Sequence, residues 1–327
     1  MDVSNDLGLI ADIGATNARF AIAGQDGFHS PEVLQCEDHE GLAEAALVYM
    51  EQIGIKAGDL KYASFSIAGP VKGDSFKMTN HPWTFSVERT KLQLGLEKLY
   101  MMNDFRAIAL SIPHLQPDDV YQVGGGVPTP HQSIGIVGPG TGLGVAALIW
   151  DVDAQRYVPV SGEGGHVTAP AKTQREFDVF KVLRNKYRHV SAERVCSGKG
   201  LVNVYDAICE LDERSDLPRK TAEEISKSAI AGECEVCAEA LDMMMDFLGI
   251  VSGNLALTIG AFGGIYIAGG IVAKLGEHFK KSRFREFFLS KGRFEDYLAQ
   301  VPTFVIQNSF AAFVGLQADL KVRLQGL

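Results

Sequence analysis

Short apolar runs around glycine-containing turns open the chain. Runs at residues 8–13 and 19–24 flank a turn at 14–17, a pattern that predicts a β-hairpin. The same order of strand, glycine turn and strand returns over residues 133–150, around the glycine-rich segment 138–144. This repetition predicts a duplicated α/β unit, with two lobes that face a cleft.

Apolar residues at helical spacing predict the helices. The expected helices span residues 41–53, 86–95, 104–112, 174–186, 198–211, 235–257 and 311–324. Ser86 is a candidate N-cap, and the run Thr221-Ala222-Glu223-Glu224 is a capping box. Further strands are predicted at 62–68, 99–102, 265–268 and 303–307. Alternating helices and strands of this kind indicate the α/β class.

One uncharged stretch is long enough to cross a bilayer, from Phe247 to Ala273. It contains Ser252, Asn254 and Thr258, and the pair Gly263-Gly264 divides it. We therefore expect a buried helix followed by a core strand, and no membrane partner.

Composition narrows the class of protein further. The 327 residues exceed what one hydrophobic core usually holds, which also favours two lobes. The net charge of −9 argues against a nucleic-acid-binding surface. The acidic start, Met1 to Asp6, lacks the apolar core of a targeting peptide, so a cytoplasmic location is expected.

Five cysteines without framework spacing suit a reducing compartment. Two of them form the motif Cys234-x-x-Cys237 at the predicted start of a helix. The motif can be interpreted as half a zinc site, as a redox pair or as ordinary helix residues. No second Cys or His pair lies nearby to complete a zinc site.

Two turns have the composition of phosphate-binding loops. The first is Asp12-Ile13-Gly14-Ala15-Thr16-Asn17, in which small residues let backbone N–H groups approach phosphate oxygens and Asp12 can hold hydrated Mg²⁺. The second, residues 138–144, has four glycines in seven residues. It is neither a Walker loop, since no Lys-Ser/Thr follows, nor a Rossmann loop, since a strand follows. An ordinary hairpin turn is the alternative for the first, whereas a glycine-rich loop like the second usually exists because something approaches its backbone.

Polar residues after predicted strands are the other candidates. Asn103-Asp104 ends one strand where a helix begins, the place for a group that orients a hydroxyl and takes its proton, although Asp104 could simply cap that helix. Glu163, His166 and Glu193 offer acceptors and a donor for a polyhydroxylated ligand. A metal role for Glu163 and His166 is the less favoured alternative, because their spacing is not that of a zinc helix.

The pair Gly269-Gly270 follows the strand predicted at 265–268 and precedes a helix. It would let an adenine or a ribose approach the backbone, or it would only turn the chain.

These elements, in this order, resemble the bacterial glucokinase family of the hexokinase and actin-like sugar-kinase superfamily. The resemblance spans nearly the whole chain. It rests on the motifs Asp12 to Arg19, Met78-Thr79-Asn80-His81-Pro82-Trp83, Asn103-Asp104-Phe105, Gly140 to Gly144, Gly162 to His166, Ser191 to Val195, Gly263-Gly264 and Ala268 to Ile271.

The resemblance implies a two-lobed, actin-like ATPase fold of duplicated ribonuclease H-like units, with a small domain of residues 1–113 plus 304–327 and a large domain of 114–303. It implies ATP-dependent phosphorylation of the glucose 6-hydroxyl, which begins glycolysis, in a homodimer, with Asp104 as catalytic base. Glucose would be bound by Asn103, Asp104, Glu163, His166 and Glu193. The nucleotide would lie along Ala11, Asp12, Ile13, Gly14, Ala15, Thr16, Asn17, Gly140, Thr141, Gly142, Gly269 and Gly270.

Two residues depart from the family pattern. The family usually has a glycine where this chain has Ala15, which would be strained if that position needed a positive φ. Pro139 stands where a small residue is common, and it removes a backbone donor. Both bear on nucleotide affinity. The remaining alternatives are a kinase of another hexose, use of ADP in place of ATP, and an inactive sugar-sensing homologue.

Overall fold

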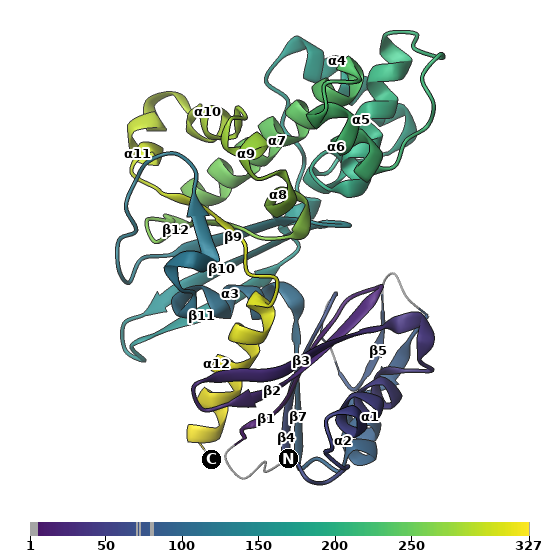
Figure 1. Ribbon diagram of the computed structural model, residues 1–327. Helices are drawn as coiled ribbons and strands as arrows, with labels where there is room; N and C mark the ends of the chain where they lie inside the picture. The colour runs from purple at the N-terminus through teal and green to yellow at the C-terminus, as the bar shows by residue number, and fades with distance from the viewer. Residues whose placement is uncertain (1–5, 70, 72, 79–81, 327) are drawn as a thin grey trace. The chain divides into compact units, whose positions relative to one another are not determined.

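The computed structural model describes residues 6–69, 71, 73–78 and 82–326 (Figure 1). Thr79, Asn80 and His81 of the sequence motif around Trp83 lie outside the described residues. The chain divides into two compact units. The first contains residues 1–116 and 308–327, and the second contains residues 117–307.

A five-stranded sheet forms the centre of the first unit. Its strand order is β3 (Gly27–Gln35), β2 (Asn17–Gly24), β1 (Gly8–Ile13), β4 (Tyr62–Ile67) and β7 (Lys98–Asn103). Strand β1 runs antiparallel to β2 and parallel to β4, and β4 runs parallel to β7.

Helices cover both faces of this sheet, and the alternation of β1 assigns its residues to them. Leu9, Ala11 and Ile13 are buried in a cluster with residues of α1 (Leu42–Gln52) and with Leu94 of α2 (Val87–Leu94). Ile10 is buried instead with residues of α3 (Asp104–Ser111) and α12 (Ala311–Gln325). Asp12 therefore shares the face of β1 on which α3 lies.

The second unit repeats this strand order. Its six-stranded sheet runs β11 (Arg156–Gly162), β10 (Leu143–Asp151), β9 (Ile134–Pro139), β12 (Gly264–Ile267), β13 (Thr303–Ile306) and β8 (Val120–Gln122). As in the first unit, the central strand β9 is antiparallel to β10 and parallel to β12, which is parallel to β13. The repetition that the two hairpins predicted is thus visible in the sheets.

Strand β13 corrects one boundary. The sequence assigned residues 304–327 to the small domain, but β13 pairs with β12 and β8 in the sheet of the second unit. Its residues are hydrogen-bonded there, so only the segment after Gln307, which contains α12, belongs to the first unit.

The second unit contains more helix than strand. Its longer helices are α4 (Gln174–Lys186), α5 (Gly198–Leu211), α6 (Ala222–Ile230) and α7 (Glu235–Ile259). Thr173 and Thr221 begin α4 and α6 with capping boxes. The shorter elements are α8 (Gly270–Leu275), α9 (Glu277–Lys280), α10 (Phe284–Leu289), α11 (Glu295–Ala299) and, in the first unit, the hairpin of β5 (Ser75–Lys77) and β6 (Thr84–Ser86).

Helix α7 is long and apolar enough to cross a membrane by length and composition alone. Its most apolar stretch is 78% buried inside the protein, as is usual for the core helix of a folded domain. The strand β12 follows it and is largely buried. The prediction of a buried helix and a core strand for this uncharged segment is therefore confirmed.

Candidate active site

Three parallel strands of the first unit end side by side. The register pairs Ile13 of β1 with Ile67 of β4, and Ile67 with Asn103 of β7. In α/β sheets this carboxyl edge is where ligands usually bind. Asp12 and the pair Asn103-Asp104 therefore lie at the edge of the sheet, where the sequence analysis predicted candidate functional residues.

Asp104 is fixed by its neighbours through one oxygen. Its Oδ1 accepts hydrogen bonds from Asn103 Nδ2 at 2.9 Å and from the backbone N–H of Phe105 at 2.9 Å. Asn103 is the residue that caps α3, since its Oδ1 accepts from the N–H of Arg106 at 3.2 Å. The sequence left open that Asp104 only caps this helix, and the structure gives that role to Asn103.

Burial and a nearby charge shift the titration of Asp104. Burial disfavours its charged form, the negative charge of Asp12 adds to this effect, and together they outweigh its hydrogen bonds and raise the pKa of Asp104 to about 6. A carboxylate with a pKa close to neutral can accept a proton and release it again at physiological pH.

Asp12 is held by two partners on neighbouring strands. Its Oδ1 accepts from the Ser66 hydroxyl at 2.8 Å, and its Oδ2 forms an ion pair with Arg19 at 3.1 Å. Both partners are set by register, because Asp12 lies opposite Arg19 on β2 and opposite Ser66 on β4. Each carboxylate oxygen thus has a protein partner.

The first glycine turn joins β1 to β2 and is closed by its own backbone. Gly14 N–H donates to the Asn17 carbonyl at 2.9 Å, and Thr16, which is exposed, accepts at its carbonyl from Cys36 N–H at 2.8 Å. Ala15 does not have a positive φ. Alanine at this position is therefore unstrained, and it stiffens the turn relative to glycine.

The second glycine turn is tied to Glu193. The Leu143 N–H donates to Glu193 Oε2 at 3.0 Å, and a Cβ on Gly142 would lie 2.4 Å from the same oxygen. Gly142 thus lets the Glu193 carboxylate approach the turn closely, and its φ is not one that only glycine adopts. Pro139 is accommodated because it lies within β9. Gly269 packs closely against it, since a Cβ on Gly269 would lie 2.6 Å from the Pro139 carbonyl oxygen.

A cavity of about 550 Å³ lies beside this turn in the second unit. The turn contributes Gly140 and Thr141, and the start of α8 contributes Gly270 and Ile271. The remaining lining comes from α5, α6 and α8, in the form of Gly198, Leu201, Ala222, Glu223, Ser226, Lys227, Ile230, Lys274 and Leu275. Apolar walls with a few polar groups at this volume are typical of a small-molecule site.

The segments that carry Glu163, His166 and Glu193 also meet at Leu143. A Cβ on Gly165 would lie 2.0 Å from the Leu143 carbonyl oxygen, so the turn 164–166 packs directly on β10. Val167 in turn accepts a hydrogen bond from Ala192 N–H at 2.8 Å. Glu163 and His166 are exposed, whereas Glu193 is half-buried.

The predicted residues thus form two clusters, one in each unit. Residues 11–17, Asn103 and Asp104 gather at the edge of the first sheet, and the remaining predicted residues gather around Leu143 and the cavity. The sequence missed Ser66 and the α5 and α6 contributions to the cavity. The available signal for the cavity was Ile230, an apolar residue at the end of the amphipathic helix α6. Its side chain is 50% exposed.

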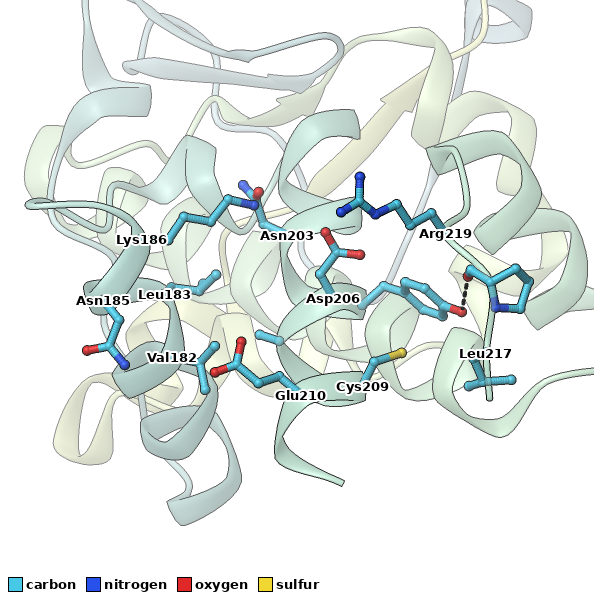
Figure 2. Close-up of a pocket in the computed structure, with 13 residues that line it drawn as sticks. Val182, Leu183, Asn185, Lys186, Asn203, Asp206, Cys209, Glu210, Leu217 and Arg219 are labelled. Atoms are coloured by element: carbon cyan, nitrogen blue, oxygen red, sulfur yellow. Dashed lines mark hydrogen bonds between the residues drawn. The ribbon is translucent and has the colours of Figure 1, made fainter. Parts of the chain in front are cut away.

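A second cavity, of about 520 Å³, lies between α4, α5 and the segment 217–219 (Figure 2). In Figure 2, Asp206 and Arg219 lie near each other on its wall. It contains none of the predicted site residues. One of its lining residues, Asn203, donates to the Arg194 carbonyl at 3.1 Å and so braces the turn that carries Glu193.

Among the described residues, no group of three His, Cys, Asp or Glu side chains is arranged to hold a metal ion. The alternative in which Glu163 and His166 are metal ligands therefore finds no third side chain in the described part of the chain.

Known proteins resemble this chain over nearly its full length. A family model described as Glucokinase matches residues 9–322. The glucokinase of Aromatoleum aromaticum is 47% identical over 97% of this chain and 96% of its own length. The glucokinase of Neisseria meningitidis serogroup B is 41% identical over 98% of this chain and 96% of its own length. A crystal structure of a glucokinase from an Antarctic psychrotroph, 34% identical, has a TM-score of 0.85 and covers 96% of this chain and 98% of that one.

Proposed function

We propose that this chain, which belongs to the glucokinase family, phosphorylates the 6-hydroxyl of glucose with ATP and uses Asp104 as the catalytic base. The family assignment rests on the match over residues 9–322 and on relatives that are 41–47% identical. ATP-dependent phosphorylation of glucose is the activity of that family. The proposal concerns how this chain's own residues carry it out.

The observation that carries the mechanism is the state of Asp104. It lies at the carboxyl edge of the sheet, its Oδ1 is held by Asn103 and Phe105, and its pKa is raised to about 6. The second oxygen, Oδ2, is the atom that would accept the proton of a sugar hydroxyl. Asn103 would fix the carboxylate so that this oxygen keeps its direction.

The chemical step is an in-line transfer. The sugar O6 forms a bond to the γ-phosphorus as the bond from that phosphorus to the β–γ bridging oxygen of ATP breaks. The O6 proton passes to Asp104, and ADP leaves with the electron pair of the broken bond. Because the transition state is loose, the proton moves late, and positioning the hydroxyl is the larger part of the task.

The second unit offers a place for the nucleotide. The apolar side chains of Leu201, Ile230 and Ile271 line the cavity and would contact an adenine base. Helix α5 begins at the cavity, where Gly198 N–H donates to the Gly140 carbonyl. The positive end of this helix would favour a phosphate beside Gly140 and Thr141.

Magnesium fits the first unit through Asp12. Two carboxylates, Asp12 and Asp104, lie near enough for the charge of one to raise the pKa of the other, and a divalent cation would relieve this repulsion. Since Ser66 and Arg19 occupy the oxygens of Asp12, a bound Mg²⁺ would reach it through water. When bound, the ion neutralises phosphate charge.

Asn103 and Asp104 of the first unit are proposed to bind sugar hydroxyls, and within the second unit the same role is proposed for Glu163, His166 and Glu193. The exposed Glu163 and His166 are free to meet a ligand in the described structure, and Glu193 is anchored on Leu143 N–H. Carboxylates accept hydrogen bonds from hydroxyls, and an imidazole can donate or accept.

The wider assignments follow from the same family. The repeated strand order supports a duplicated ribonuclease H-like, actin-like fold. A cytoplasmic enzyme at the start of glycolysis, acting as a homodimer, fits the family resemblance and the acidic composition.

A coupled assay with glucose, mannose and fructose, each with ATP and with ADP, tests the function. We expect turnover with glucose and ATP in the wild-type protein. We expect Asp104→Asn to lose about 10²–10⁴-fold in kcat while the circular dichroism spectrum and glucose binding by calorimetry persist. Near-normal kcat in Asp104→Asn would exclude Asp104 as the base. Preferred turnover of mannose or fructose would assign another hexose, and glucose binding without any turnover in the wild type would indicate a sensor.

A further inference from the structure

Helix α7 begins with a cysteine pair that the phosphoryl-transfer mechanism does not use. Cys234 is the N-cap of this 25-residue helix, and its Sγ accepts a hydrogen bond from the backbone N–H of Cys237 at 3.4 Å. This hydrogen bond places the Cys234 sulfur next to the backbone of Cys237, whose own thiol lies one helical turn away. N-caps are usually Ser, Thr, Asp or Asn, so here a thiol occupies an oxygen's position.

The two thiols differ in exposure. Cys234 is partly exposed and lies among exposed neighbours, residues 231–233 and Glu235. Cys237 is fully buried beneath it. An outside reagent can therefore reach Cys234 first, while Cys237 can be reached only from within the protein.

The surroundings of the two thiols also shift their pKa values in opposite directions. Partial burial alone would raise the pKa of Cys234, but hydrogen bonds from the Cys237 thiol and from the N–H groups of Cys237 and Val236 outweigh it, and with the charge of Lys220 they lower the pKa. Burial, reinforced by the hydrogen bond to Cys234, raises the pKa of Cys237 to about 12. A thiolate at a helix N-terminus is the form of cysteine that attacks disulfides.

We propose that Cys234 and Cys237 form a reversible disulfide site, in which Cys234 is the attacking thiol and Cys237 is the resolving thiol. The oxidant is a small-molecule disulfide such as oxidised glutathione. The Cys234 thiolate bonds to one sulfur of that disulfide and expels the other as a thiolate. Cys237 then gives its proton to the small thiolate released in the first step, bonds to Cys234 Sγ and expels the second small thiolate. The protein thereby gives up two electrons, which the small disulfide gains.

A third cysteine is the natural competitor. Cys209 of α5 is half-buried and packs against the same core cluster as Cys234. The pairing with Cys237 is favoured because these two residues share one helical turn and because the Cys237 N–H donates to Cys234 Sγ.

The test uses the full-length protein equilibrated in buffers that range from reduced to oxidised glutathione. Free thiols are trapped with an alkylating reagent after acid quenching and unfolding, and peptides are mapped by mass spectrometry. We expect a Cys234–Cys237 link in oxidising buffer that dithiothreitol reverses, with three of the five thiols still free. The buried Cys36 and Cys196 serve as internal controls that stay reduced.

Variants assign the two roles. Cys237→Ser should accumulate a glutathione adduct on Cys234, because the proposed resolving thiol is missing, whereas Cys234→Ser should form neither adduct nor link. Cys209→Ser is the matched control and should behave as wild type. A Cys209–Cys234 link, a lasting adduct without a link in the wild type, or five free thiols in oxidising buffer would overturn the proposal. The wild-type map decides the question even if a variant fails to fold.

Discussion

At the residue scale, Asp104 is a functional carboxylate whose surroundings lower the stability of the folded protein. The fold partly buries a carboxylate and places Asp12 close enough to repel it, and the hydrogen bonds from Asn103 and Phe105 only partly offset this. Groups of this kind often lower stability in exchange for chemistry. The consequence can be measured separately for activity and for stability.

The acid limb of the rate profile should follow this carboxylate. The base must be deprotonated to act, so kcat/KM for glucose should fall as the pH drops through about 6. A plot of log kcat/KM against pH, measured at saturating ATP, checks this. An acid limb near 4, the ordinary range of an aspartate, would contradict the environment that we describe.

Removing the charge should stabilise the protein. The pKa of Asp104 is raised in the folded state, so its unfavourable charge is absent below the unfolded pKa and present above the folded one. Asp104→Asn should therefore be more stable than wild type at pH 8 by on the order of 1–2 kcal/mol. The advantage should shrink as the pH falls from 7 to 4. Urea unfolding of both proteins at several pH values measures the difference, and a pH-independent difference would be against it.

Much of the site could be named from the sequence, because the strand–turn patterns and the family resemblance gave the order of its motifs. What could not be predicted is which polar atoms are already occupied. The binding of Asp12 by Ser66 depends on register between β1 and β4, and the bond from Leu143 N–H to Glu193 joins residues 50 positions apart. Contacts of that range depend on the tertiary fold and leave no local pattern.

At the scale of elements, the second glycine turn links the two proposed ligand regions. Its Gly142 faces Glu193, which is proposed to bind the sugar, while its Gly140 and Thr141 line the cavity proposed for the nucleotide. From the sequence alone, Glu193 was expected to act on the sugar and not on the nucleotide. The hydrogen bond to Leu143 makes it a positioning residue for the turn as well.

Gly142→Ala should therefore weaken the binding of both substrates, glucose and ATP. The new methyl would lie 2.4 Å from Glu193 Oε2 and displace the carboxylate, breaking its bond to Leu143 N–H. We expect the KM values for glucose and for ATP each to rise roughly 5- to 30-fold, as for a lost hydrogen bond of about 1–2 kcal/mol. Steady-state kinetics with each substrate varied in turn provide the measurement.

The control for this change is Gly125→Ala, since a Cβ there meets nothing within 4 Å. It should leave both KM values unchanged. Glu193→Ala should reproduce the double effect of Gly142→Ala. If it raises the KM for glucose alone, Glu193 does not position the turn.

The elements themselves were predicted where pattern and caps agree. The predicted spans of β1, α4 and α5 coincide with the observed elements, since β1 is a nearly continuous buried run and α4 and α5 begin at side-chain N-caps. Strand β3 was missed because most of its residues are exposed or half-buried, and β11 because it alternates exposed and half-buried residues at a sheet edge. Edge strands with little burial give little hydrophobic signal.

At the scale of the whole molecule, the chain folds as two units with separate hydrophobic cores. Helix α12 contributes a core face to the first unit. Phe313, Leu316 and Leu320 of α12 are buried against Ile10 and Ala107, which are more than 200 residues earlier in the sequence. A Cβ on Gly315 would lie 1.9 Å from the Ala107 carbonyl oxygen, so α12 and α3 are in backbone contact. The helix that begins at Asp104 therefore depends on the end of the chain.

The two tryptophans allow each unit to be followed by itself. Trp83 is buried in the first unit, and Trp150 stacks on His131 in the second, with ring centroids 4.0 Å apart. Trp150→Phe leaves a reporter of the first unit, and Trp83→Phe leaves a reporter of the second. Leu316→Ala, made in each background, removes fully buried atoms from the first unit only.

We expect Leu316→Ala to lower the free energy of unfolding reported by Trp83 by roughly 2–5 kcal/mol, the usual effect of a cavity in a core. The transition reported by Trp150 should move much less, because that core contains no residue of α12. Urea titrations followed by tryptophan fluorescence give both values. Val322→Ala, at an exposed position of the same helix, is the matched control and should change either value by less than about 0.5 kcal/mol. Equal shifts of both transitions would mean that the two units unfold as one, and the separate cores would then not be separate in energy.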